Sequence, residues 1–170
     1  MKHGILFFGS LFALLSIPSY GRSIDAGAPY RPLMLYNGTW WVTPLQSTKR
    51  DILEDHCDRT GKFYSCEQTV NGKTVALIVF VPAALTGHYY TQTILPDGHA
   101  SGRGDLKIAG DRWVYSSKDV AGSKTTYYRT VNVFVDKDHI HFDSQESTDG
   151  TSWKTTQSGD ERRALASEMK

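Results

Sequence analysis

Most of the chain is patterned as short β-strands. Ile140 and Phe142 alternate with His139 and His141, and residues 130–135 place valine at every second position. A two-residue period is typical of a strand with one buried face and one face in water. Such runs, bounded by turn-forming residues, predict ten strands. The predicted strands span residues 39–46, 49–56, 62–70, 73–81, 86–95, 99–108, 111–118, 124–135, 138–146 and 151–157.

Tight turns separate these strands. Asn71-Gly72 is the strongest hairpin signal, because a type I′ turn needs positive φ at both central residues. No helical pattern of roughly 10–15 residues intervenes, which disfavours a parallel βαβ arrangement. We therefore predict an all-β fold, an antiparallel up-and-down meander closed into a barrel of about 8–10 strands, since closure removes exposed sheet edges. A two-sheet β-sandwich is the alternative.

The pattern also divides the chain into segments. They are a signal peptide at 1–21, an irregular lead-in at 22–36, a single β-barrel domain at 37–160 and a C-terminal tail at 161–170. Residues 76–81 are apolar without alternation, which predicts a strand covered on both faces, with residues 22–36 as the cover. The tail begins with residues 161–165, which are expected to form a short helix or to stay irregular.

The first segment has the order of residues found in secretory signals. A basic start, Met1-Lys2-His3, precedes an apolar run over residues 5–17 and then small residues up to Gly21. The apolar run is shorter than the roughly 20 residues that a membrane-spanning helix needs. An uncleaved anchor is the alternative. The sequence predicts a periplasmic or secreted protein, cleaved near Gly21, with no integral membrane segment in the mature chain.

Charge excludes one broad class of partner. Lys and Arg number 19 and Asp and Glu 18, for a formal charge of +1, so attraction of nucleic acid by bulk charge is not expected. A content of 39% hydrophobic and 22% charged residues is typical of a folded domain rather than of a disordered chain.

The two cysteines are expected to pair. Export places Cys57 and Cys66 in an oxidising space, and Gly61 between them allows the chain to turn back. Two reduced thiols are the alternative. Zinc binding together with His56 lacks an evident fourth ligand.

The entrance to the first predicted strand resembles a known family. The Gly-x-Trp pattern in Asn37-Gly38-Thr39-Trp40-Trp41 is similar to the start of calycins, the lipocalin-like barrels. Residues 127–132 and 147–153 resemble small exported bacterial calycin-like proteins of unassigned function. The resemblance covers residues 37–160 and implies a barrel in which Trp40 plugs the closed end. It also implies that a late arginine, Arg129 or Arg162, packs across this ring, and it implies no activity.

Aromatic residues supply the candidate ligand site. Barrels of this size can enclose one small ligand, and the nine Tyr and four Trp exceed what a minimal core requires. The candidate ligand-binding residues are Trp41, Tyr90, Arg103, Trp113, Tyr115, Tyr128 and Arg129, with Gly38 and Trp40 as structural residues. In the alternative interpretation, the rings only fill the barrel, and Phe134 belongs with them.

Motifs for other chemistry are weak. His139 and His141 share one face of a strand, with Asp138 and Asp143 nearby, but Ile140 and Phe142 take the inner face, so we expect a solvated outer pair and no metal site. No Gly-x-Ser-x-Gly elbow is present, and we predict no catalytic residue and no cofactor.

The sequence thus favours an exported barrel that binds a small amphipathic or aromatic ligand without catalysis. Arg103 or Arg129 is expected to meet an anionic group of that ligand. Two alternatives remain. One is an envelope structural or interaction module with a filled interior and an outer contact surface near Trp41 or residues 76–81. The other is a small hydrolase or isomerase that uses His88 or His99. The protein partner stays unknown.

Overall fold

The computed structural model describes residues 28–165 and 167–168. The predicted signal peptide at 1–21 and the start of the lead-in lie outside these residues. Two short 3-10 helices, η1 (Ala28–Tyr30) and η2 (Pro32–Leu35), precede the strands. The strands are β1 (Gly38–Pro44), β2 (Asp51–Thr60), β3 (Phe63–Val70), β4 (Lys73–Pro82), β5 (His88–Ile94), β6 (Gly104–Ala109), β7 (Arg112–Ala121), β8 (Lys124–Asp136), β9 (His139–Ser147) and β10 (Lys154–Arg163).

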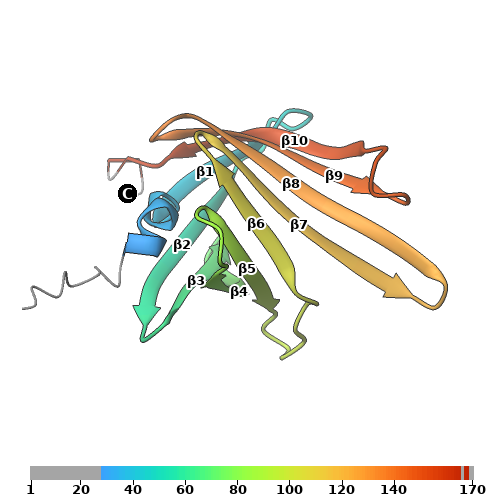
Figure 1. Cartoon of the computed structure of the whole chain (residues 1–170). Helices are drawn as coiled ribbons and strands as arrows, with labels where there is room; N and C mark the ends of the chain where they lie inside the picture. Colours follow the sequence, from blue (N-terminus) through green and yellow to red (C-terminus); the bar gives the residue numbers. More distant parts are fainter. Residues whose placement is uncertain (1–27, 166, 169–170) are drawn as a thin grey trace, which may run out of the picture.

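The strands form one closed antiparallel barrel. Each pairs with its neighbours in the chain, and β1 pairs with β10 to complete the ring (Figure 1). The predicted meander barrel is confirmed, and the sandwich alternative is wrong. The type I′ signal at Asn71-Gly72 is also confirmed, since both residues have positive φ, 51° and 74°.

One hairpin extends beyond the others. The β7–β8 ladder continues to the Ala121–Lys124 pair, whereas β6 pairs with β7 only as far as Ser116. Figure 1 shows this hairpin reaching past its neighbours at the end of the barrel away from η1 and η2.

The lead-in closes the other end of the barrel. From η1 and η2, Tyr30 and Leu33 turn inward and are 5% and 1% exposed. The Tyr36 ring follows them and packs edge-on against Trp113, with ring centroids 5.1 Å apart. Trp40 is fully buried beside them, and its indole Nε1 donates to the Tyr36 carbonyl at 2.9 Å. These residues form an aromatic plug.

The arginine that packs on Trp40 is Arg163, so the prediction of Arg129 or Arg162 is wrong. The guanidinium of Arg163 lies 4.2 Å from the Trp40 ring centroid. Register explains this, because Trp40 pairs directly with Arg163 across β1 and β10. Gly38 makes room for it. A Cβ at Gly38 would lie 2.7 Å from Arg163 Nη1, and its φ of 130° suits only glycine.

The last strand differs most from the prediction. The pattern predicted a strand over 151–157 and a helix or tail after it, but β10 runs from Lys154 to Arg163. This strand carries no large apolar side chain, so the sequence shows no alternation of apolar and polar residues that would predict it. Gly159 faces the interior, where the Phe142 ring occupies the space that a side chain would need. A Cβ at Gly159 would lie 2.8 Å from this ring.

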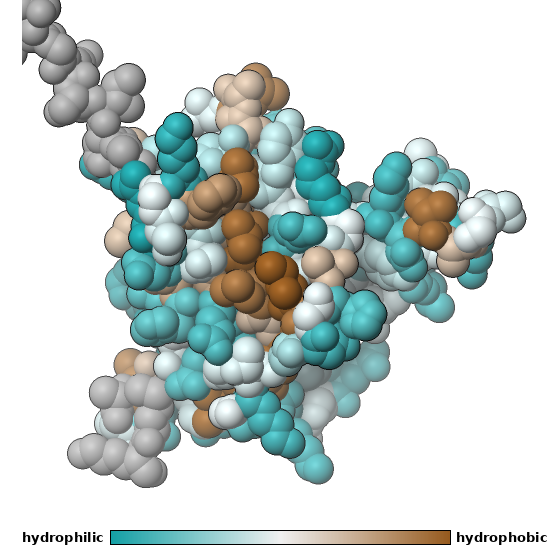
Figure 2. Space-filling model, turned by 90° about the horizontal axis from the view of Figure 1, so that it is seen from below, coloured by the Kyte–Doolittle hydropathy of each residue, from teal (hydrophilic) through white to brown (hydrophobic). Residues whose placement is uncertain are grey.

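The outer face of β4 is exposed, so the prediction that this strand is covered on both faces is wrong. Leu77 and Val81 are 38% and 36% exposed, because the lead-in residues 28–36 enter the barrel end rather than covering the wall. Figure 2 shows an apolar stripe in the region of this strand. Ala76 and Phe80 alternate with these residues and are buried inside the barrel.

Cys57 and Cys66 form the predicted disulfide. The two residues lie directly opposite each other on β2 and β3, so the bridge fixes the register of this hairpin. Within the described residues, no helix is long and apolar enough to cross a membrane.

Candidate functional site

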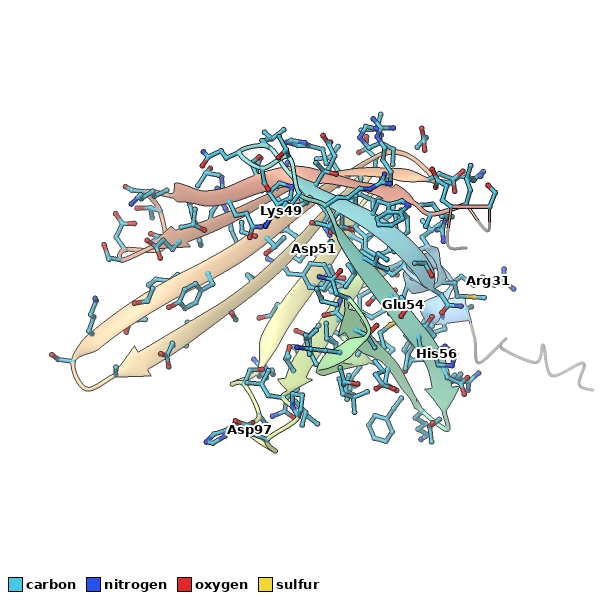
Figure 3. All side chains as sticks on the ribbon, turned by 180° about the vertical axis from the view of Figure 1, so that it is seen from behind. Arg31, Lys49, Asp51, Glu54, His56 and Asp97 are labelled. Atoms are coloured by element: carbon cyan, nitrogen blue, oxygen red, sulfur yellow. A yellow bond between two sulfur atoms is a disulfide. The ribbon has the colours of Figure 1, made fainter. Side chains whose placement is uncertain are left out.

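Above the aromatic plug, the barrel encloses a cavity of about 350 Å³. Asp51 begins β2 and Val70 ends β3, so these two lining residues place the open rim at the end away from the plug. Asp51 is labelled at this position on β2 in Figure 3. The wall is mostly apolar, with rings from Tyr36, Phe80 and Tyr115. Such a size and lining are typical of sites for small organic ligands.

Asp55 is the most deeply buried acid of this cavity. The side chains of β2 alternate, so Asp55 shares the inner face with Cys57, while Glu54 points to the other face. Asp55 is 3% exposed. Its Oδ1 accepts a hydrogen bond from Gln68 Nε2 at 2.9 Å, and Oδ2 has no partner. Burial raises the pKa of this carboxyl from 3.8 to about 6, and the Gln68 bond opposes the rise.

Glu161 brings a second carboxylate from the last strand. It pairs with Val42 of β1 and lines the same cavity. Its Oε2 is buried and has no hydrogen-bond partner. Burial, and then the charge of Asp55, raise the pKa of Glu161 from 4.5 to about 7. The two carboxylates therefore face the same interior and repel each other when both are ionised.

An amide and two phenols complete the polar part of the cavity. Asn132 is 5% exposed, and its Nδ2 donates to the Tyr36 hydroxyl, which leaves Oδ1 without a partner. The Tyr36 and Tyr115 rings lie edge to face with centroids 6.2 Å apart, and burial raises the pKa of both hydroxyls. The negative charges of Asp55 and Glu161 also raise the pKa of Tyr115, so both carboxylates lie near the tyrosine pair.

The sequence-predicted ligand residues fall into two groups. Tyr115 lines the cavity, and Trp113 is 1% exposed in the plug. Tyr128 and Arg129 line a second hollow of about 160 Å³, which shares Tyr115 and Thr130 with the first. The Arg129 guanidinium lies over Trp153 at 4.0 Å, and its Nε donates to Gln145 at 2.5 Å.

The other predicted ligand residues line neither of these hollows. Trp41 is covered by Arg50, whose guanidinium lies 3.9 Å from its ring centroid. Tyr90 is 39% exposed and stacks with Arg103 at 4.5 Å. A shift of one residue along a strand moves a side chain to the opposite face, which is why Trp40 and Trp41 have different surroundings.

The histidine pair lies with Asp160. His139 Nε2 and His141 Nδ1 are 3.0 and 3.2 Å from Asp160 Oδ1. Burial would raise the pKa of Asp160, but its hydrogen bonds and attraction to the two imidazoles lower it. Within residues 28–165 and 167–168, no group of three or more His, Cys, Asp or Glu is arranged to hold a metal ion. His99, from the hydrolase alternative, sits in a turn beside Asp97, with its side chain 84% exposed.

Sequence reasoning missed the polar residues of the main cavity. No motif in the sequence points to Asp55, and Glu161 falls in the predicted C-terminal tail. One signal was present: Asp51, Leu53, Asp55 and Cys57 form an alternating row that mixes acids with apolar residues. Whether this row faces the interior or the solvent depends on how β2 pairs with β1 and β3 in the closed barrel.

No protein-family model and no curated protein match the chain. Among solved structures, it is similar to the one described as the crystal structure of Rv2717c from M. tuberculosis, with a TM-score of 0.44 and 14% identity, over 81% of this chain and 98% of that one. The barrel implied by the calycin resemblance is observed, while membership of that family stays a prediction.

Proposed function

We propose that this protein is a small-molecule-binding barrel whose site is the cavity above the aromatic plug. One observation carries the proposal: the cavity holds buried polar atoms of Asp55, Asn132 and Glu161 that have no protein partner. Leaving a buried acceptor unpaired costs roughly 1–3 kcal/mol, so such atoms are normally satisfied by water or a ligand. The apolar wall around them suits an amphipathic or aromatic molecule.

A hollow interior supports binding over a structural module with a filled interior. Support for the hydrolase or isomerase alternative is weak, since no histidine is among the described residues that line the main cavity. Among the same described lining residues, the only sulfur belongs to Cys66, which is held in the disulfide. We further propose that the chain works outside the cytoplasm, with which this disulfide is compatible.

Native mass spectrometry of protein purified from an exporting host tests the binding function. We expect a non-covalent adduct that disappears on denaturation, and binding of aromatic fragments by NMR once the cavity is emptied by refolding. Thr130→Phe inserts a ring into the cavity and should abolish both signals. Val135→Phe adds the same ring at a position 60% exposed on the same strand and should leave them intact. Absence of an adduct and of fragment binding in the wild type would refute the proposal.

A further inference from the structure

The unpartnered atoms of the cavity share one chemical property. Among the described residues, the buried side-chain atoms without a hydrogen-bond partner are Asp55 Oδ2, Asn132 Oδ1 and Glu161 Oε2. An amide oxygen and ionised carboxylate oxygens only accept hydrogen bonds. Asp55 and Asn132 are both more than nine-tenths buried, so neither can turn to bulk water. The unpartnered atoms of the cavity are therefore hydrogen-bond acceptors, and they favour a ligand that carries several hydrogen-bond donors.

The charge of the lining has a single sign. Asp51, Asp55 and Glu161 line the cavity, and no Lys, Arg or His is among its described lining residues. Arg129 lines only the adjoining hollow, where Trp153 and Gln145 already engage it. An anionic ligand would meet these carboxylates without a compensating cation, whereas a cationic ligand would neutralise them.

The internal hydrogen bonds of the cavity leave the acceptors open. Asn132 uses its amide nitrogen on Tyr36, and Gln68 uses its amide nitrogen on Asp55. The rings of Tyr36 and Tyr115 lie beside the acceptors, and an aromatic face attracts a cation as well as an apolar group. Phe80, Phe142 and the aliphatic side chains supply the apolar wall.

We propose that the ligand of this cavity carries a primary ammonium group on an apolar or aromatic body, and that Asp55, Glu161 and Asn132 accept its N–H bonds. An ammonium group has three donors, which matches the three open acceptors. This inference rests on the proposed binding function and narrows it to one class of ligand. It replaces the expectation of an anionic group held by Arg103 or Arg129.

Three probes of nearly equal size and different charge test the inference. 2-Phenylethylamine is a cation near neutral pH, 2-phenylethanol is neutral and phenylacetate is an anion. Isothermal titration of each into refolded, ligand-free protein at pH 8 measures the preference of the cavity for charge. We expect the amine to bind at least about tenfold more tightly than the other two, because charge-assisted hydrogen bonds are the stronger ones.

Matched variants test whether the two buried carboxylates cause the preference for the amine. Asp55→Asn and Glu161→Gln each keep the side-chain size and should reduce the preference for the amine to within about threefold. Glu54→Gln removes an acid from the neighbouring exposed position of β2 and should leave the preference unchanged. Circular dichroism establishes that each variant is folded, and if one variant fails to fold, the other variant and the wild-type comparison still decide the question.

The outcomes separate this inference from the proposed function. Tight binding of the amine, lost in the two cavity variants, supports both. Equal or tighter binding of the alcohol or of phenylacetate overturns the ammonium inference and leaves the binding function standing. If no probe binds and native protein carries no adduct, both are overturned.

Discussion

Replacing Asp55 with asparagine should remove a pH dependence from the stability of the ligand-free barrel. The substitution keeps the size of the side chain and an oxygen to accept the Gln68 hydrogen bond, but it removes the charge. In the wild type, this carboxyl is 3% exposed and its Oδ2 has no partner. Burial raises its pKa from 3.8 to about 6.

The sign and size of this change in the free energy of unfolding follow from the difference in proton binding between the folded and unfolded chains. Between pH 3.8 and about 6, the folded chain holds the Asp55 proton and the unfolded chain has lost it. The free energy of unfolding therefore falls as pH rises through this window and stays lower above it. At roughly 1.4 kcal/mol per pKa unit, Asp55 accounts for a loss of about 3 kcal/mol. Asp138 and Asp149, whose pKa values are lowered, have the opposite effect and act below this window.

Urea unfolding from pH 4 to 8 measures the effect. We expect the wild type to lose about 2.5 kcal/mol more than Asp55→Asn over this range, slightly less than the full loss because an unfolded Asp55 is already partly ionised at pH 4. Glu161, whose pKa is also raised by burial, gives both proteins a further decline, which is smaller in Asp55→Asn because the charge of Asp55 no longer adds to the rise. Glu54→Gln is the control and should follow the wild type. Equal slopes for the wild type and Asp55→Asn, or a wild-type stability that rises over this range, would refute the reasoning.

Three further predictions concern the frame of the site. Gly38→Ala should lower the free energy of unfolding by about 1–3 kcal/mol in urea titrations, since a side chain there meets Arg163 at a strained φ, and a loss below about 0.5 kcal/mol would contradict this. Cys57→Ser with Cys66→Ser should cost roughly 2–3 kcal/mol, and a reductant should then have no effect on the variant while it destabilises the wild type. Leu77→Gln, on the exposed face of β4, should change stability by less than about 0.5 kcal/mol and reduce self-association in light scattering, so a large loss of stability would show that this face is covered.

The fold was predictable from sequence to a large extent because strands and hairpin turns leave local signals. Alternation and turn residues located all ten strands, and each observed strand overlaps a predicted one. Errors arose where the local signal is missing. The inner row of β10 is polar or glycine, so no apolar period marks residues 158–163. The Gly-x-Trp pattern identified the ring that is buried in the plug, but not Arg163 as its partner, because that pairing depends on the register between the two ends of the barrel.

The site was less predictable than the fold. Reasoning from aromatic content found Tyr115, which lines the cavity, and Tyr128 and Arg129, which line the adjoining hollow. It missed Asp55 and Glu161, because an acid in an amphipathic strand is most often exposed. Whether such an acid faces inward depends on which face the closed barrel turns to its interior, and this is a property of the whole sheet rather than of the segment.

The pairing of β1 with β10, which closes the barrel, also restricts the order in which the chain can fold. Arg163 donates to the Asn37 carbonyl across 126 positions, so the pairing of β1 with β10 must wait until almost the entire barrel sequence is available. Before then, β1 and β9 are free edges of an open sheet, and such edges can recruit other chains. Glu161 arrives with that last strand and meets Asp55 only when the ring closes. A chain that ends before β10 therefore lacks the closed cavity and leaves the edges of β1 and β9 open to aggregation.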